Sequence, residues 1–141
     1  MKFDEVVTID WYDNILKSFC FDDSNAVYYC CILALNAQTD EKIYFCVDIK
    51  YIAGQSELID IIKSDSFKEN WNRMPKLVRL KKVNQAYLIK ARNLRTDQVD
   101  LVRYKDNVKL SKKILWGEYP DVLEDTGEID NWWLTFEGLN L

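Results

Sequence analysis

Residues 26–35 read AVYYCCILAL and residues 42–50 read KIYFCVDIK, with the turn-forming residues 36–41 between them. The first segment is short, apolar at every position and rich in Tyr, Val and Ile, which predicts a central strand buried on both faces. The second segment alternates between two sets of side chains, which predicts a strand with one wetter face. Its two sets are Ile43, Phe45, Val47 and Ile49 on one side, and Tyr44, Cys46, Asp48 and Lys50 on the other.

The flanking sequence extends this pair of strands into a larger sheet. We expect a first strand at Val6, Val7 and Ile9, and a second at residues 15–21, which a turn at residues 22–25 joins to the central strand. Downstream, short strands are expected at residues 77–83, 86–91, 99–104 and 108–115, with turns near Asn84, at residues 93–97 and at Asp106-Asn107. The pattern predicts a mostly antiparallel, curled sheet.

One helical segment interrupts the strands. After Gly54 the apolar period changes to that of a helix, which Ser56 can cap, and residues 66–69 (Ser-Phe-Lys-Glu) have the form of a capping box before Pro75. We therefore expect a helical segment at about residues 56–74, packed on the sheet. A chain of 141 residues has the typical size of one domain, so the expected fold is α+β, with residues 1–141 as a single domain.

Charge is distributed unevenly along the chain. Residues 76–113 hold twelve Lys or Arg against three Asp or Glu, whereas residues 114–141 hold seven acids and no base. The basic strands 76–113 suit either phosphate binding by a nucleic-acid-associated protein or a solvated face that discourages aggregation of strand edges. For the first alternative, the candidate contacts are Arg79, Lys81, Lys90, Arg92, Arg95 and Arg103, with Tyr87 and Tyr104 available to stack on bases.

Motifs for catalysis and cofactor binding are missing from the sequence. It contains no histidine, which removes the usual base of Ser-His and Cys-His nucleophile pairs. The four glycines are too dispersed for a phosphate-binding loop, and the cysteine spacing does not fit a zinc site. We therefore expect no cofactor, no metal site and no enzymatic activity. A carboxylate-based hydrolase stays open as an alternative, with Asp10, Asp13 and Asp48 as candidate acids.

Nothing at the start of the sequence resembles a secretory signal, and the longest apolar run, residues 26–35, is too short to span a membrane. We therefore expect a cytoplasmic location and no membrane partner. In a reducing cytosol, the cysteines at positions 20, 30, 31 and 46 are expected to stay thiols that pack as small apolar groups.

The acidic C-terminal segment is the candidate interaction surface. Residues 116–141 combine carboxylates with tryptophans, and paired Trp side chains indicate a segment docked on the domain rather than a disordered tail. Carboxylates attract a basic protein at long range, and aromatic side chains anchor such interfaces. The candidate contact residues are Asp121, Glu124, Asp125, Glu128, Asp130, Trp132 and Trp133.

In composition the chain is similar to the small acidic immunity proteins that bacteria keep against basic toxic enzymes. The resemblance implies a non-enzymatic protein-binding module that occludes a basic partner with an acidic and aromatic surface.

Overall fold

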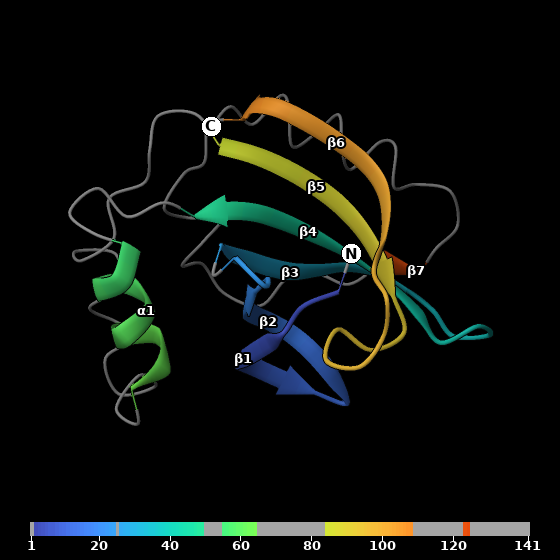
Figure 1. The fold of residues 1–141 in the computed structure, drawn as a ribbon. Coiled ribbons are helices and arrows are strands. Elements are labelled where there is room, and N and C mark those ends of the chain that lie inside the picture. The colour runs from blue at the N-terminus through green and yellow to red at the C-terminus, as the bar shows by residue number, and fades with distance from the viewer. Residues whose placement is uncertain (1, 25, 50–54, 65–83, 109–122, 125–141) are drawn as a thin grey trace.

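A computed structural model describes residues 2–24, 26–49, 55–64, 84–108 and 123–124. In these residues the chain forms a sheet and one short helix (Figure 1). The elements are β1 (Glu5–Tyr12), β2 (Asn14–Phe21), β3 (Val27–Asn36), β4 (Glu41–Ile49), α1 (Gln55–Lys63), β5 (Asn84–Ala91), β6 (Asp100–Val108) and β7 (Leu123–Glu124).

The sheet is a meander in which each strand pairs with its neighbour in the sequence. Its order is β1-β2-β3-β4-β5-β6, and all of these pairings are antiparallel. The two-residue strand β7 pairs in parallel with β3, with Leu123 opposite Ala34 and Glu124 opposite Leu35. The prediction of a mostly antiparallel sheet with a helical segment is therefore confirmed for the part of the chain that the structure describes.

Both faces of the sheet bury apolar side chains. One cluster takes alternate residues of β3 and β4, including Tyr29, Phe45 and Val47, and the other takes the residues between them, including Ile32, Tyr44 and Cys46. The central strand at residues 26–35 is thus buried on both sides, as predicted. The prediction of a wetter face on β4 was wrong, because the curl of the sheet encloses that face as well: Tyr44 is 2% exposed and Cys46 is 1% exposed.

Contacts across the concave face show how strongly the sheet curls. The Tyr44 hydroxyl on β4 reaches past β3 and donates a hydrogen bond to the Ile15 carbonyl on β2 at 3.2 Å. The guanidinium of Arg95, in the connection between β5 and β6, donates to Thr8 Oγ1 on β1 at 2.5 Å. The two ends of the meander are therefore joined by side chains in addition to the backbone ladder.

Helix α1 packs beside the β1–β2 end of the other face. Ile62 is buried in the first cluster, with Ile59 and Ile61 against it. Lys63 forms an ion pair with Glu5 of β1 (Nζ–Oε2 2.6 Å), and its ammonium lies 4.8 Å from the centre of the Phe21 ring. Of the helical segment expected at about residues 56–74, the part from residue 65 onward lies outside the described residues.

Two strand boundaries differ from the sequence-based expectation. Asn84, expected near a turn, begins β5 and pairs with Val108. The turn predicted at Asp106-Asn107 was wrong, because these residues lie inside β6. There the register shifts from Ala86 opposite Lys105 to Asn84 opposite Val108, so the turn-forming residues sit in a β-bulge. The strand predicted at residues 77–83 falls outside the described residues. Of the strand predicted at residues 108–115, only Val108 is described, and it is the last residue of β6.

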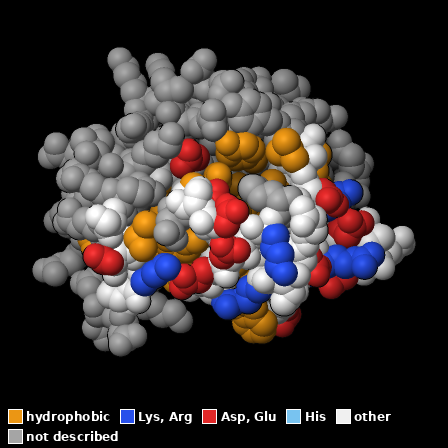
Figure 2. Space-filling model, in the orientation of Figure 1, with side chains coloured by type: hydrophobic (Ala, Val, Ile, Leu, Met, Phe, Trp, Pro, Cys, Tyr) orange, Lys and Arg blue, Asp and Glu red, His pale blue; other side chains and the backbone are white. Residues whose placement is uncertain are grey.

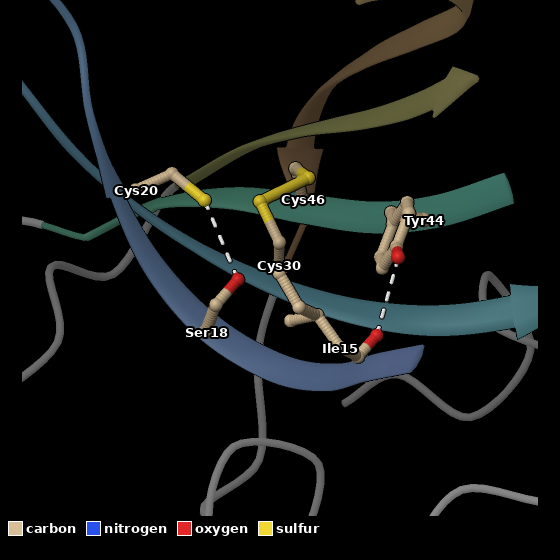
Figure 3. The surroundings of a disulfide bond; sticks show 6 residues. All are labelled: Ile15, Ser18, Cys20, Cys30, Tyr44 and Cys46. Atoms are coloured by element: carbon tan, nitrogen blue, oxygen red, sulfur yellow. Dashed lines mark hydrogen bonds between the residues drawn. A yellow bond between two sulfur atoms is a disulfide. The ribbon is translucent and has the colours of Figure 1, made fainter. Parts of the chain in front are cut away.

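A disulfide joins the two central strands (Figure 3). Cys30 and Cys46 are directly opposite in the β3–β4 ladder, with their Cα atoms 4.3 Å apart, the spacing of a non-hydrogen-bonded antiparallel pair. The expectation that all four cysteines stay thiols was therefore wrong for this pair, because strand register places the two side chains side by side. Cys20 and Cys31 are free thiols. The cytoplasmic location stays a prediction.

We expect the Cys30–Cys46 disulfide to contribute to stability by restricting the unfolded chain. Cross-linking a loop of about 15 residues contributes about 3 kcal/mol in the chain-entropy description. Chemical unfolding of the wild type with and without a thiol reductant should differ by about this amount. The C30A/C46A variant serves as the control, because it should respond to denaturant identically in both conditions. Equal stability of the wild type in both conditions would contradict the disulfide's role.

Asp22 organises the turn between β2 and β3. Its Oδ1 accepts hydrogen bonds from the Ser24 amide (2.9 Å), the Ser24 hydroxyl (2.7 Å) and the Ala26 amide (2.9 Å), and its Oδ2 accepts one from the Tyr28 hydroxyl (3.2 Å). Burial alone would raise the pKa of Asp22, but these hydrogen bonds outweigh it and lower the pKa below its ordinary value of 3.8. The carboxylate form therefore stabilises the folded chain.

The lowered pKa of Asp22 predicts a pH dependence of stability. Because the folded-state pKa lies below the unfolded one, the contribution of Asp22 is complete above the unfolded pKa and is lost as the pH falls through the folded pKa. The free energy of unfolding of wild type minus that of D22N should be largest above about pH 5 and should shrink toward acid. Urea titrations across this range would measure it, and a pH-independent difference would rule out the assignment.

Candidate functional site

A pocket of about 480 Å³ lies at one end of the sheet. Its walls come from three parts of the chain that the meander brings together: residues 11 and 13–15 of the β1–β2 hairpin, residues 40, 42 and 44 at and near the start of β4, and residues 92–95 after β5. The volume is within the range of small-molecule sites in proteins. This pocket is the candidate functional site.

Two tight turns with aspartate in the left-handed region shape the pocket rim. Asp13 (φ 56°) makes the one-residue connection between β1 and β2, and Asp40 (φ 59°) precedes β4. Aspartate tolerates this conformation better than most residues, because its short polar side chain can bond locally. In the second turn, Asn36 Oδ1 accepts the amides of Gln38 (3.0 Å) and Thr39 (3.2 Å). The rim is thus fixed by short-range hydrogen bonds.

The connection after β5 is also held at several points. The Asp97 amide bonds the Asn93 carbonyl (3.0 Å), while the Asn93 amide bonds Asp97 Oδ2 (3.1 Å). The Arg95 amide bonds Asn93 Oδ1 (2.9 Å). Between the two arginines, Leu94 is 0% exposed and belongs to the second apolar cluster. Arg92 and Arg95 are therefore presented from a loop whose middle is anchored in the core.

Lys42 connects two of the pocket walls. The residue is 5% exposed, and its ammonium donates to Asp40 Oδ1 at 2.9 Å and to the Arg92 carbonyl at 2.8 Å. An ammonium buried in this way is tolerated because both a carboxylate and a carbonyl accept its protons. Lys42 thereby connects the β3–β4 turn to the arginine-bearing loop and serves as a structural support of the site.

The pocket is polar, with one aromatic side chain at its rim. The lining cations are Lys42, Arg92 and Arg95, and the lining acids are Asp13 and Asp40, which leaves one net positive charge (three minus two). Trp11 is 62% exposed. Figure 2 shows acidic and basic side chains interleaved at the lower right of that view, where Figure 1 places the β3–β4 connection.

The thiols of the described residues are poor nucleophiles. Burial raises the pKa of Cys20 to about 12, and it raises the pKa of Cys31 to about 11. Both are therefore protonated near neutral pH, and a thiol reacts chiefly as the thiolate. Within the same residues, no group of three or more Cys, Asp or Glu side chains is placed to hold a metal ion. No helix among them has the length and apolar character that crossing a membrane requires.

The structure brings together part of the predicted basic set. Arg92 and Arg95 line one pocket, whereas Lys90 is half-buried on β5 away from it. Tyr87, expected to be available for stacking on bases, is half-buried and packs edge-on against Tyr28, with ring centres 6.0 Å apart. Arg103 and Tyr104 lie in β6, but their side chains are not described. Arg79 and Lys81 fall outside the described residues.

The candidate acids are spread over the molecule. Asp10 accepts the Trp11 amide (3.1 Å) on β1, and Asp13 forms the adjacent turn. Asp48 lies on β4 opposite Tyr28, three strand spacings from β1, which is roughly 14 Å along the sheet. Glu124 is in β7, and its side chain is not described. The other predicted contact residues fall outside the described residues: Asp121, Asp125, Glu128, Asp130, Trp132 and Trp133.

Of the pocket residues outside the basic strands, sequence reasoning named Asp13 as a candidate acid and missed most of the others. Trp11, Asp40 and Lys42 were not singled out, and Tyr44 was assigned only to a strand face. One signal was present for Trp11, because it precedes the turn formers Asp13 and Asn14, and a Trp beside a tight hairpin turn has little sheet to cover it. The contact of Lys42 with the Arg92 carbonyl spans fifty residues and depends on the register of β4 and β5, which places Lys42 opposite Ala91.

Comparisons with protein-family models, curated proteins and solved structures found no match for this chain.

The role of Lys42 can be tested by stability. K42M leaves the Arg92 carbonyl without its donor, which should lower the free energy of unfolding by about 1–3 kcal/mol. Amide hydrogen exchange of residues 92–95 should also accelerate. D40N is the matched control, because it removes the ion pair and keeps the carbonyl contact. Asp40 is 74% exposed, so solvent screens its carboxylate and the loss should be smaller, about 1 kcal/mol or less. An equal loss in both variants would mean that the ion pair, and not the carbonyl contact, supports the loop.

Proposed function

We propose that this protein is a non-enzymatic protein-binding module, of the immunity or inhibitor type, that occludes a basic protein partner. The contact surface is the acidic and aromatic C-terminal segment, with Trp132 and Trp133 as anchors and the neighbouring carboxylates as the attracting charges. Such charges raise the rate of encounter with a basic protein, while buried aromatic groups lower the rate of dissociation. The activity of the partner is blocked by coverage, without chemistry by this chain.

The observation that carries this proposal is the pairing of β7 with β3. Glu124 belongs to the acidic segment, and its backbone lies opposite Leu35, next to the β3–β4 turn. Glu41, at the start of β4, adds a further carboxylate beside that turn, whereas Asp40 is paired with Lys42. The sheet thus provides a fixed attachment point for part of the segment. Attachment supports the proposal, because a preorganised surface loses less conformational entropy on binding than a free tail.

Charge reversal tests the proposed surface. The triple variant D121K/E124K/D125K should associate with a basic partner at least about tenfold more slowly at low salt, because electrostatic steering is lost. The partner is the basic polypeptide that the immobilised protein retains from a nuclease-treated native lysate, and stopped-flow mixing gives the rate constants. The fold should be unaffected, as checked by circular dichroism.

The matched control is D4K/D23K/D60K, which makes the same change in net charge at three exposed acids outside the segment. A general charge effect would slow both triple variants equally, and that result would contradict a specific role for residues 121–125. Unchanged association in the first variant would also contradict the proposal.

A nucleic-acid-associated role is the second candidate. The observation in its favour is that Arg92 and Arg95, from the basic strands, line the same pocket as the exposed Trp11.

A further inference from the structure

The pocket at the end of the sheet has the charge of an anion site. Lys42 and Asp40 are 2.9 Å apart and compensate each other. The remaining charges are the guanidiniums of Arg92 and Arg95 and the carboxylate of Asp13, so the lining keeps one net positive charge (two minus one). Guanidinium groups bind phosphate oxygens through paired, charge-assisted hydrogen bonds. An anionic group is therefore favoured beside the loop of residues 92–95.

The two arginines are suited to hold one anion. They flank Leu94, whose side chain is fully buried, and both are exposed to solvent. The Thr8 contact uses Nη2 of Arg95, and a guanidinium has five N–H donors in total, so donors remain for a ligand. Lys42 holds the backbone of Arg92 and Thr8 holds the side chain of Arg95, so less ordering of this loop is needed when a ligand binds.

The other walls carry groups that recognise a planar, hydrogen-bonding ring. Trp11 is 62% exposed and offers an aromatic surface. Any of the nucleobases can stack on such a ring, because each has a flat π-face. Asn14 and Asn93 also line the pocket, and side-chain amides match the donor and acceptor pattern of base edges. Asp13 adds an acceptor for an exocyclic amine. A simple inorganic anion would use neither the ring of Trp11 nor the carboxylate of Asp13.

We propose that this pocket binds a nucleotide, with the phosphate held by Arg92 and Arg95 and the base against Trp11. A volume of about 480 Å³ accommodates one nucleotide-sized ligand. The nucleotide is either a free mononucleotide or one residue of a single-stranded nucleic acid, since both present the same phosphate and base. This site goes beyond the protein-binding role, and it is assayed without any protein partner.

Isothermal titration calorimetry with the full chain tests the site. Adenosine monophosphate should bind more tightly than adenosine or inorganic phosphate, because only the nucleotide engages both walls. R92Q and R95Q should each weaken adenosine monophosphate binding about tenfold or more, the effect of losing a charge-assisted hydrogen bond. W11A should weaken binding to a similar extent, while W11F should retain part of the stacking.

K2Q is the matched charge control. Lys2 is exposed and precedes β1, at the opposite end of that strand from Trp11, so its loss should leave the affinity unchanged. Thermal melting checks the folding of each variant. Because R95Q also removes the Thr8 contact, R92Q provides the test if R95Q is unstable.

A short single-stranded oligoadenylate distinguishes a free mononucleotide from a single-stranded nucleic acid as the natural ligand. Tighter binding than the mononucleotide, weakened steeply by salt and by the same substitutions, would support a strand as the source. Equal affinity would support the free nucleotide. Three results would overturn the proposal: no binding of either ligand, R92Q and W11A indistinguishable from K2Q, or an acidic peptide that binds more tightly than both nucleotide ligands.

Discussion

Burial of the β3–β4 pair on both of its faces is the constraint on which the rest of the structure depends. Each face of these strands carries large apolar side chains, so neither face can be left to water. The short helix α1 contributes to covering one face, and the other is enclosed because the sheet bends around it. The hydrogen bond from Tyr44 to Ile15 and that from Arg95 to Thr8 are consequences of this bend, since a flat sheet would keep these residues apart.

The same bend creates the candidate site. A flat meander would spread its turns along an edge, whereas a curled one gathers the ends of separate hairpins. The pocket walls accordingly combine connections with the strand residues next to them, and most of the polar lining residues lie in the connections. Lys42 links the apolar core to the polar pocket. Its aliphatic stem is buried with β4, while its ammonium binds the loop after β5. A scaffold held by apolar packing thus positions a set of charged and amide side chains.

Strands that depend on local sequence patterns, such as apolar runs and turn-forming residues, were predicted correctly in the described part of the chain. The apolar run at residues 26–35 and the turn formers at residues 22–25 and 36–41 depend on short-range preferences. In the described residues, β3 lies between the connecting residues 22–24 and the turn at residues 37–40. Predictions that depend on long-range geometry were less successful. The exposure of Tyr44 and Cys46 was misjudged because alternation identifies two faces without saying that both are covered. The Asp106-Asn107 turn was misjudged because a β-bulge accepts the same residues.

The candidate site shows the same division. Composition drew attention to Arg92 and Arg95, but nothing local to them indicates that Trp11 and Asp40, distant in the sequence, would complete a pocket. The disulfide was missed for a related reason, since opposition of Cys30 and Cys46 follows from the register of a hairpin and not from their spacing alone.

Because each strand pairs with its neighbour in the sequence, the strand order affects how the chain folds during its synthesis. Each strand from β2 to β6 can pair with its predecessor as it leaves the ribosome, because that partner has already been synthesised. β7 is the exception, since it returns to β3 about ninety residues after that strand was made. Until then, the backbone groups of Ala34 and Leu35 on that side lack their final partner, and an unpaired strand edge invites another chain. Premature termination before residue 123 would therefore leave a truncated product whose unpaired strand edge favours aggregation.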